Sequence, residues 1–401
     1  MFGQENMNIN SAVIKVMGVG GGGCNAVNSM ISSNITSAEF IAVNTDNQAL
    51  LLSKADKCLQ IGKKLTKGLG AGSDPSVGEA AAEESKEEIA SMLEGTDLLF
   101  IASGMGGGTG TGAASVVARI AREMGILTVA VVTKPFTFEG RVRNENANKG
   151  ISNLKKYVDT LVIIPNDKLL QFLPAQTGML DAFKVADDML KQGIVGIVDL
   201  IATPSLINLD FADVNTVMRN QGLAHMGIGK SKGENRIIES VRQAVSSPLL
   251  ETTIEGAKSV ILNVTGGKDI MLNEINEAAM LVQGIIDESA NMIFGATIDE
   301  NMVDEVKITV IATGFSSTAN VKSEPKVEVK PVVAKEEKVL EELPLISKIE
   351  EQERITAETE KMAEQLERPI VYEREEVEKQ EEPAPTKSRE LPAFMRKLFK
   401  K

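Results

Sequence analysis

Residues 103–112 carry a strong chemical signal, because six of these ten residues are glycine. They follow an apolar run at residues 97–103 and precede an Ala- and Val-rich segment at residues 113–124. The pattern predicts a buried strand that ends in a glycine turn, and the turn opens a helix. Bare backbone N–H groups at the positive end of a helix dipole bind phosphate. A merely flexible loop is the alternative, but so many glycines are unfavourable in conformational entropy for a simple connector.

A second glycine-rich segment lies at residues 18–23, after a β-branched run at residues 12–17. Its spacing satisfies G-x-G-x-x-G, and Asp46 comes about 20 residues later, as in dinucleotide-binding oxidoreductases. A redox enzyme more often offers a poised His or Lys, whereas the single histidine, His225, is expected in a strand. The oxidoreductase alternative also leaves residues 103–112 unexplained. Two phosphate-binding segments could instead enclose one nucleoside triphosphate.

The elements that must position these segments alternate between strand and helix. Strands are predicted at residues 12–17, 40–43, 58–61, 97–103, 127–132 and 160–164, and helices from residue 24 and at residues 74–93, 113–124 and 139–157. The alternation predicts an α/β fold, a doubly wound and mostly parallel sheet with its ligand loops at the carboxyl ends of the strands. We expect residues 12–177 to form this domain, with both glycine segments at one edge.

The rest of the chain divides into further parts. Residues 178–202 show a long helical pattern that is apolar around much of its circumference, so we expect a central helix buried between two bodies. Residues 203–316 mix strand and helix patterns and predict a second, smaller α+β domain. Residues 320–388 contain 19 Glu, no Asp and 12 Lys plus Arg, so residues 317–388 are expected to be a disordered acidic linker.

The two ends of the chain are expected to differ in role. Residues 1–11 are polar and predict a flexible N-terminus without the apolar core of a signal peptide. Residues 389–401 restore apolar side chains after the acidic linker and end in a basic run. They predict a docking peptide that folds when its side chains enter a groove, and a frayed tail is the alternative.

Composition excludes several classes of protein. A net charge of −13 argues against nucleic acid as a partner. Two cysteines fit a reducing compartment and cannot supply a four-ligand zinc site. No apolar run approaches the ~18 residues of a membrane span. We therefore expect a cytoplasmic protein.

Several motifs in order and at matching spacing resemble the tubulin/FtsZ family of bacterial cell-division GTPases. Residues 106–112, Gly-Gly-Gly-Thr-Gly-Thr-Gly, match the tubulin signature. Residues 18–28, 138–141, 165–167 and 208–214 match further motifs of the FtsZ family. The resemblance covers about residues 14–315 and resumes at residues 391–396, which look like the family's C-terminal peptide. Cys24 departs from the family's usual Gly or Asn, and the basic residues 397–401 could add contact with anionic lipid.

The resemblance implies a GTPase that polymerises head to tail and forms the cytokinetic ring at mid-cell. It implies GTP or GDP, with Mg²⁺ held mainly by the nucleotide phosphates and no separate metal site in the protein. Membrane-anchoring and regulatory division proteins would bind residues 389–401, so membrane contact would be indirect or weak. A non-hydrolysing tubulin-like scaffold is the alternative within the same fold.

Backbone groups of both glycine segments are expected to hold the phosphates. These residues are Gly20, Gly21, Gly22, Gly23, Cys24 and Asn25 in the first segment and Gly104, Gly106, Gly107, Gly108, Thr109 and Gly110 in the second. Ala71 and Gly72, in a turn cluster, are expected to sense the γ-phosphate. Glu139 can accept from ribose hydroxyls with Arg143 as a donor nearby, although this i,i+4 spacing also suits a plain surface salt bridge.

Three residues are expected to contact the nucleoside. Guanine presents two adjacent donors that one carboxylate can accept together, whereas adenine does not, so Asp187 is the expected base-reading residue. Phe183 lies four residues earlier on the same helix face and could cover the base. Asn166 follows a strand and is expected either to contact the nucleoside or to cap a helix, and Asp187 could simply lie on a solvated helix face.

Asn208, Asp210 and Asp213 raise the question of mechanism. An Asp-x-x-Asp pattern before a helix can be a helix cap. The resemblance instead assigns this segment to the active site of the next subunit. There Asp210 and Asp213 would polarise the attacking water and help to hold the cation, with Asn208 positioning them.

Overall fold

The computed structural model of the 401-residue chain describes residues 12–33, 35–170, 174, 176–202, 207, 210–246, 254–287, 289–300 and 302–315. The chain divides into two compact units, Met1–Glu324 and Pro325–Lys401, and the described residues belong to the first. The expected flexible N-terminus (1–11), linker (317–388) and docking peptide (389–401) lie outside the described residues, as does Asn208.

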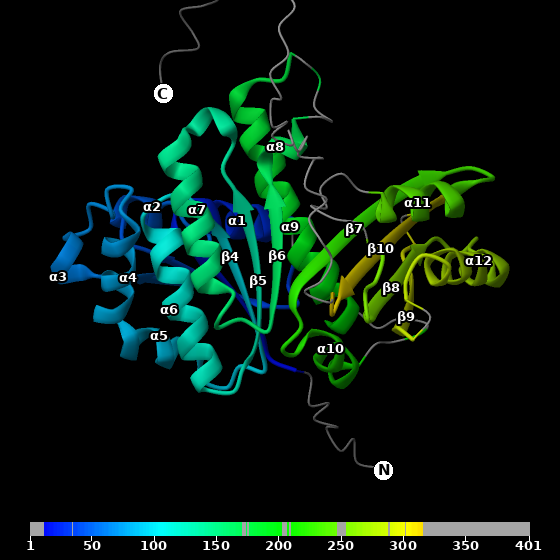
Figure 1. Ribbon diagram of the computed structural model, residues 1–401, viewed down its shortest axis with the longest axis horizontal. Helices are drawn as coiled ribbons and strands as arrows, with labels where there is room; N and C mark the ends of the chain where they lie inside the picture. Colours follow the sequence, from blue (N-terminus) through cyan, green and yellow to red (C-terminus); the bar gives the residue numbers. More distant parts are fainter. Residues whose placement is uncertain are drawn as a thin grey trace, which may run out of the picture. The chain divides into compact units, whose positions relative to one another are not determined.

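Six parallel strands form the first part of the sheet and confirm the predicted doubly wound fold (Figure 1). In sequence order they are β1 (Ile14–Val19), β2 (Glu39–Asn44), β3 (Lys57–Gln60), β4 (Leu98–Gly104), β5 (Leu127–Lys134) and β6 (Thr160–Pro165). Their spatial order is β3-β2-β1-β4-β5-β6. Most of these strands are continuous aliphatic runs because helices cover both faces of the sheet.

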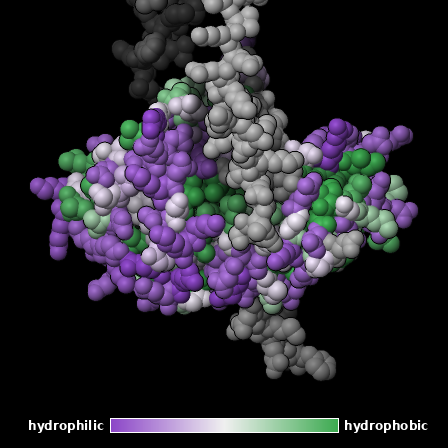
Figure 2. Space-filling model, in the orientation of Figure 1, coloured by the Kyte–Doolittle hydropathy of each residue, from purple (hydrophilic) through white to green (hydrophobic). Residues whose placement is uncertain are grey.

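Helices pack on both faces of this sheet. The elements between the strands are α1 (Gly20–Ser32), α2 (Asn47–Leu51), α3 (Lys63–Thr66), α4 (Pro75–Glu84), α5 (Lys86–Leu93), α6 (Thr109–Glu123), the 3-10 turn η1 (Thr137–Glu139), α7 (Arg141–Leu154) and α8 (Asn166–Leu169). Helices α4 to α7 share one core with the sheet, and α1 shares another on the opposite face. Hydrophilic residues predominate on the outer surface of α4 to α7 (Figure 2). The prediction of one continuous helix over residues 74–93 is wrong, because the helix breaks at Ser85 into α4 and α5.

The predicted central helix is α9 (Met179–Ala202), with 24 residues. Its Gly193 lies against Val131 of β5, where an added Cβ would come 3.1 Å from the valine side chain. Its Gly196 lies against Met226, beyond the first six strands. The helix therefore packs on both parts of the sheet, as its broad apolar surface predicts.

The second part of the fold continues the same sheet. Its elements are α10 (Phe211–Met218), β7 (Gly222–Lys232), α11 (Arg236–Val245), β8 (Ser259–Gly266), α12 (Leu272–Gln283), β9 (Asn291–Ile298) and β10 (Glu305–Thr313). Strand β7 pairs in parallel with β6 and antiparallel with β10, so ten strands form one sheet that ends β6-β7-β10-β8-β9. This junction was not predicted, because it depends on the pairing of β7 with strands that are distant in the sequence. Gly229 allows α11 to approach, since an added Cβ would lie 1.8 Å from the Ser240 carbonyl oxygen.

Candidate nucleotide-binding site

The two glycine segments lie against each other at the carboxyl ends of the neighbouring strands β1 and β4. A Cβ added to Gly20 would lie 2.7 Å from the Gly110 nitrogen, and one added to Gly22 would lie 3.3 Å from the Gly104 Cα. The predicted convergence of the two segments at one edge is confirmed. The expectation of a helix from residue 24 is wrong, because α1 begins at Gly20. Gly20 has φ +73°, which turns the chain from strand into helix in one residue.

Hydroxyl groups fix the turn between β4 and α6. The Thr111 Oγ1 accepts a hydrogen bond from the Gly106 N–H at 2.8 Å, which closes the turn on the helix that follows. The Thr109 hydroxyl lies 2.6 Å from the Thr45 hydroxyl at the end of β2. These contacts connect the glycine turn to the first turn of α6 and to the end of β2.

The glycines of this edge fall into two kinds. A Cβ at Gly110 would lie 2.6 Å from the Ser103 Oγ and 2.8 Å from the Gly104 oxygen, so the protein itself requires glycine there. A Cβ at Gly21 or Gly107 would meet no protein atom within 4 Å. Neither residue has a positive φ. The protein has room for a side chain at these two positions, and a ligand on the edge would explain their glycines.

This difference predicts separate effects of two alanine substitutions. Gly107→Ala should leave the melting temperature unchanged within error and weaken GTP binding by roughly tenfold or more, because the methyl group would occupy phosphate space. Gly110→Ala, the matched control in the same turn, should destabilise the fold by about 1–3 kcal/mol through overpacking. Thermal unfolding and nucleotide titration measure both effects. Unchanged GTP affinity in the Gly107→Ala chain would contradict a phosphate site here.

The turn before α4 forms a third wall of the edge. A Cβ at Gly108 would lie 2.8 Å from the Ala71 Cβ and 3.0 Å from the Asp74 backbone nitrogen. Asp74 caps α4 by accepting from the Ser76 N–H at 2.8 Å. Ala71 is buried in this contact, and Gly72 is exposed beside it. The expected γ-phosphate sensors therefore lie next to the glycine turn.

Glu139 and Arg143 form the i,i+4 pair that the spacing allows. The Arg143 Nε lies 3.0 Å from the Glu139 Oε2, and the Glu139 Oε1 accepts from the Phe136 N–H at 2.9 Å. The stem of Arg143 packs on the glycine turn, since a Cβ at Gly106 would come 2.7 Å from its Cγ. The salt bridge therefore stands beside the glycine turn and not on a remote surface.

Asn166 has a buried side-chain oxygen that lacks a partner. The residue opens α8 and is 5 % exposed, and its Oδ1 makes no hydrogen bond to any described residue. It does not cap the helix, because Pro165 holds the cap position. A buried acceptor without a donor costs about 1–3 kcal/mol. A ligand with a suitably placed N–H or O–H would remove this cost.

Helix α9 brings an aromatic ring and a carboxylate to the same edge. Phe183 contacts Phe136 and Phe138 edge-on, with ring centroids 5.5 and 6.4 Å apart. Burial, together with the neighbouring charge of Asp188, raises the pKa of Asp187 to about 6. Asp188 itself pairs with Lys191 at 2.7 Å, whereas no described side chain pairs with Asp187. Asp187 is therefore a half-buried acceptor available to a ligand.

Cys24 and Asp46 are engaged within the protein. The buried Cys24 thiol donates to the Gly18 and Val43 carbonyl oxygens at 3.6 and 3.7 Å, and burial raises its pKa to about 12. Its side chain therefore faces the interior, which leaves only its backbone for a ligand. Asp46 caps α2 by accepting from the Gln48 N–H at 2.8 Å. In a dinucleotide site this carboxylate would instead accept from a ribose hydroxyl. Asn25, beside Cys24, is exposed.

Asp210 and Asp213 lie at the opposite edge of the sheet. Asp210 caps α10 by accepting from the Asp213 N–H at 2.8 Å, as the pattern allows. At the end of α10 the Met218 carbonyl oxygen accepts from the hydroxyl of Thr160, the first residue of β6. Helix α10 therefore packs at the amino end of β6, whereas Asn166 follows the carboxyl end of the same strand. The six residues of β6 span about 20 Å, so its two ends lie far apart. Figure 1 shows α8 and α10 at opposite ends of α9.

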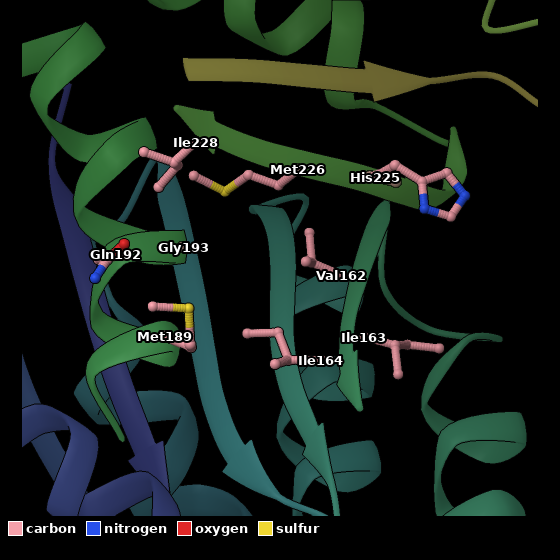
Figure 3. Close-up of a pocket in the computed structure, with 10 residues that line it drawn as sticks. Val162, Ile163, Ile164, Met189, Gln192, Gly193, His225, Met226 and Ile228 are labelled. Carbon is pink, nitrogen blue, oxygen red and sulfur yellow. The ribbon is translucent and has the colours of Figure 1, made fainter. Parts of the chain in front are cut away.

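A separate apolar cavity lies between β6, β7 and α9 (Figure 3). It is lined by residues such as Val162, Met189 and Met226, and by none of the expected nucleotide-binding residues. His225 at its margin is buried in β7 and packs edge-on against Phe315 at 4.5 Å. The prediction that His225 is a strand residue is confirmed.

Within the described part of the chain, no helix combines the length and apolarity needed to cross a membrane.

Comparisons with known proteins agree with this architecture. Residues 13–174 match the model of the Tubulin/FtsZ family, GTPase domain, and residues 222–316 match the FtsZ family, C-terminal domain. An FtsZ dimer from M. jannaschii is 45 % identical, with a TM-score of 0.74 over 79 % of this chain and 96 % of that chain. A point mutant of FtsZ from M. jannaschii is 48 % identical, with a TM-score of 0.73 over 76 % and 92 %. CetZ2 from Haloferax volcanii, a GTPγS-bound protofilament, shares the fold at 21 % identity, with a TM-score of 0.68 over 78 % and 96 %.

Proposed function

The chain belongs to the FtsZ family of tubulin-like GTPases, and from this premise we propose that it polymerises head to tail and hydrolyses GTP between subunits. One observation supports the shared site above all others. The glycine segments and Asp187 lie at the carboxyl edge of the sheet, whereas Asp210 and Asp213 lie at its amino edge. One chain cannot bring these groups together, but the next subunit can. A heterologous contact that does not close into a ring builds an open filament.

The carboxyl edge has a suitable group for each part of GTP. Backbone N–H groups near Gly21 and Gly107 hold the phosphates, with Mg²⁺ carried by the phosphate oxygens. Glu139 accepts from a ribose hydroxyl, and Asn166 uses its unpartnered Oδ1 for the nucleoside. Asp187 accepts from the two adjacent donors of guanine. Phe183 covers the base.

The amino edge of the next subunit completes the reaction. Asp210 and Asp213 polarise a water in line with the γ-phosphate, and Asn208 positions them. Two carboxylates held permanently beside a triphosphate would repel it unless a cation intervened. Delivery by a neighbour lets nucleotide binding come first and lets hydrolysis follow assembly.

In the cell, the filaments form the cytokinetic ring at the division site. The solved relatives named above come from archaea. Residues 389–401 dock to membrane-anchoring and regulatory division proteins, and the polymer acts in the cytoplasm without nucleic acid. Direct contact of the basic end with the membrane is weak.

Phosphate release measured against protein concentration tests the proposal. The rate per chain should be close to zero below a threshold concentration and should rise steeply above it, with GTP and not with ATP. A rate per chain that is independent of concentration would contradict a shared site. GTP binding without phosphate release would favour the non-hydrolysing scaffold, and preferential binding of NAD(H) would favour the oxidoreductase.

A further inference from the structure

The 3-10 turn η1 joins the elements that carry the proposed nucleoside contacts. It contains Glu139 itself, and it begins next to Phe136, whose ring stacks on Phe138 with centroids 5.0 Å apart. Both rings contact Phe183 of α9. These ring contacts therefore pack the turn against α9, the helix that carries Asp187.

A carboxylate fastens the other side of the turn to α8. The Asp167 Oδ1 accepts from the Thr137 backbone N–H at 2.8 Å, and its Oδ2 accepts from the Thr137 hydroxyl at 2.6 Å. Both carboxylate oxygens therefore accept hydrogen bonds from Thr137. Hydrogen bonds to a charged acceptor are stronger than those between neutral groups. Asp167 directly follows Asn166, so the same short helix carries the clamp and the unpartnered amide oxygen.

The geometry of Glu139 depends on this turn. One of its oxygens accepts from the Phe136 N–H, and the other pairs with Arg143. Thr137 lies between Phe136 and Glu139 in the chain, and it is exposed. Without the Asp167 clamp, the turn would be free to shift on its exposed side and would carry the Glu139 carboxylate with it.

The geometry points to Thr137 and Asp167 as positioning residues that set nucleoside affinity by holding Glu139 at the ribose. This inference rests on the proposed function, because it requires Glu139 to accept from a ribose hydroxyl. Neither residue needs to touch GTP. Their effect passes through the turn, so it should depend on the ribose hydroxyl groups of the nucleotide.

The test compares GTP with 2′,3′-dideoxy-GTP, which lacks both ribose hydroxyls, on the full chain. Thr137→Val preserves shape and removes the hydroxyl donor, and it should weaken GTP binding by about fivefold, within the range for the net contribution of one ordinary hydrogen bond. Its affinity for dideoxy-GTP should equal that of the wild type. Thr137→Ser keeps the hydroxyl donor and should bind GTP as tightly as the wild type. Thr36→Val, the same change at an exposed threonine before β2 on the amino edge, should alter neither affinity.

A double mutant separates the clamp from two independent contacts. If the pair acts as one unit, Thr137→Val combined with Asp167→Asn should weaken GTP binding no more than the stronger single variant. Equal losses for GTP and dideoxy-GTP, or no loss for GTP, would overturn the clamp. A wild-type chain that binds both nucleotides equally would overturn the ribose role of Glu139 in the proposed function itself.

Discussion

An Asp210→Asn chain should bind GTP like the wild type and should hydrolyse it roughly 100-fold more slowly or worse, the usual loss for a group that activates water. Asparagine accepts a hydrogen bond as well as aspartate does at an N-cap, so α10 should keep its cap on Asp213. The substitution therefore removes the charge and spares the helix. An unfolding curve that matches the wild type would show this.

Asp56→Asn is the matched control for this prediction. Asp56 also accepts a backbone N–H, from Phe40 at 2.8 Å, and it lies outside both proposed half-sites. Its hydrolysis rate should match the wild type. Loss of GTP binding in the Asp210→Asn chain would contradict a role in the neighbour's site, because it would place the residue at its own nucleotide.

Asp187→Asn should lower GTP affinity by roughly 100-fold and raise affinity for xanthosine triphosphate. The asparagine amide places a donor against a donor of guanine, whereas xanthine presents a carbonyl oxygen in place of the 2-amino group. Competition between the two nucleotides measures the switch. Equal losses for both nucleotides would mean that Asp187 does not contact the base edge.

The raised pKa of Asp187 adds a pH dependence. Guanine binding needs the ionised carboxylate, so GTP affinity of the wild type should fall as pH drops through about 6. The free energy of unfolding depends on pH in the opposite direction. The pKa of Asp187 in the folded chain lies above the unfolded value of 3.8, so the folded chain binds the extra proton. The free wild-type chain should therefore lose stability as pH rises from about 4 to 6. At pH 7 without nucleotide, Asp187→Asn should be more stable by about 1–2 kcal/mol, less than the ~3 kcal/mol of the full shift because the side chain is partly exposed. Thermal unfolding at pH 4 and at pH 7 measures this.

Much of the site could be predicted from sequence because its signals are local. Glycine turns after apolar runs, alternating strands and helices, and the broad apolar surface of α9 indicated the sheet and its ligand edge. The start of α1 was placed four residues late, because glycine at positions 20–23 predicts a loop unless a sharp turn at Gly20 is recognised.

The remaining features depend on contacts between distant residues. Nothing local indicates that β7 joins the two parts of the sheet, or that α10 packs beside the first residue of β6. Only the folded structure shows that the Asn166 oxygen lacks a partner. The same is true of the hydrogen bonds between Asp167 and Thr137. The roles of these residues toward GTP stay predictions.

The shared site is tested most directly by mixing two inactive chains. The Asp210→Asn chain keeps the nucleotide edge and lacks the activating carboxylate, whereas the Asp187→Asn chain keeps Asp210 and Asp213 and binds GTP poorly. With GTP present, the mixture should release phosphate well above the sum of the two separate rates, because the intact Asp210 of one chain meets GTP bound to the other. A mixture that only matches this sum would contradict hydrolysis between subunits.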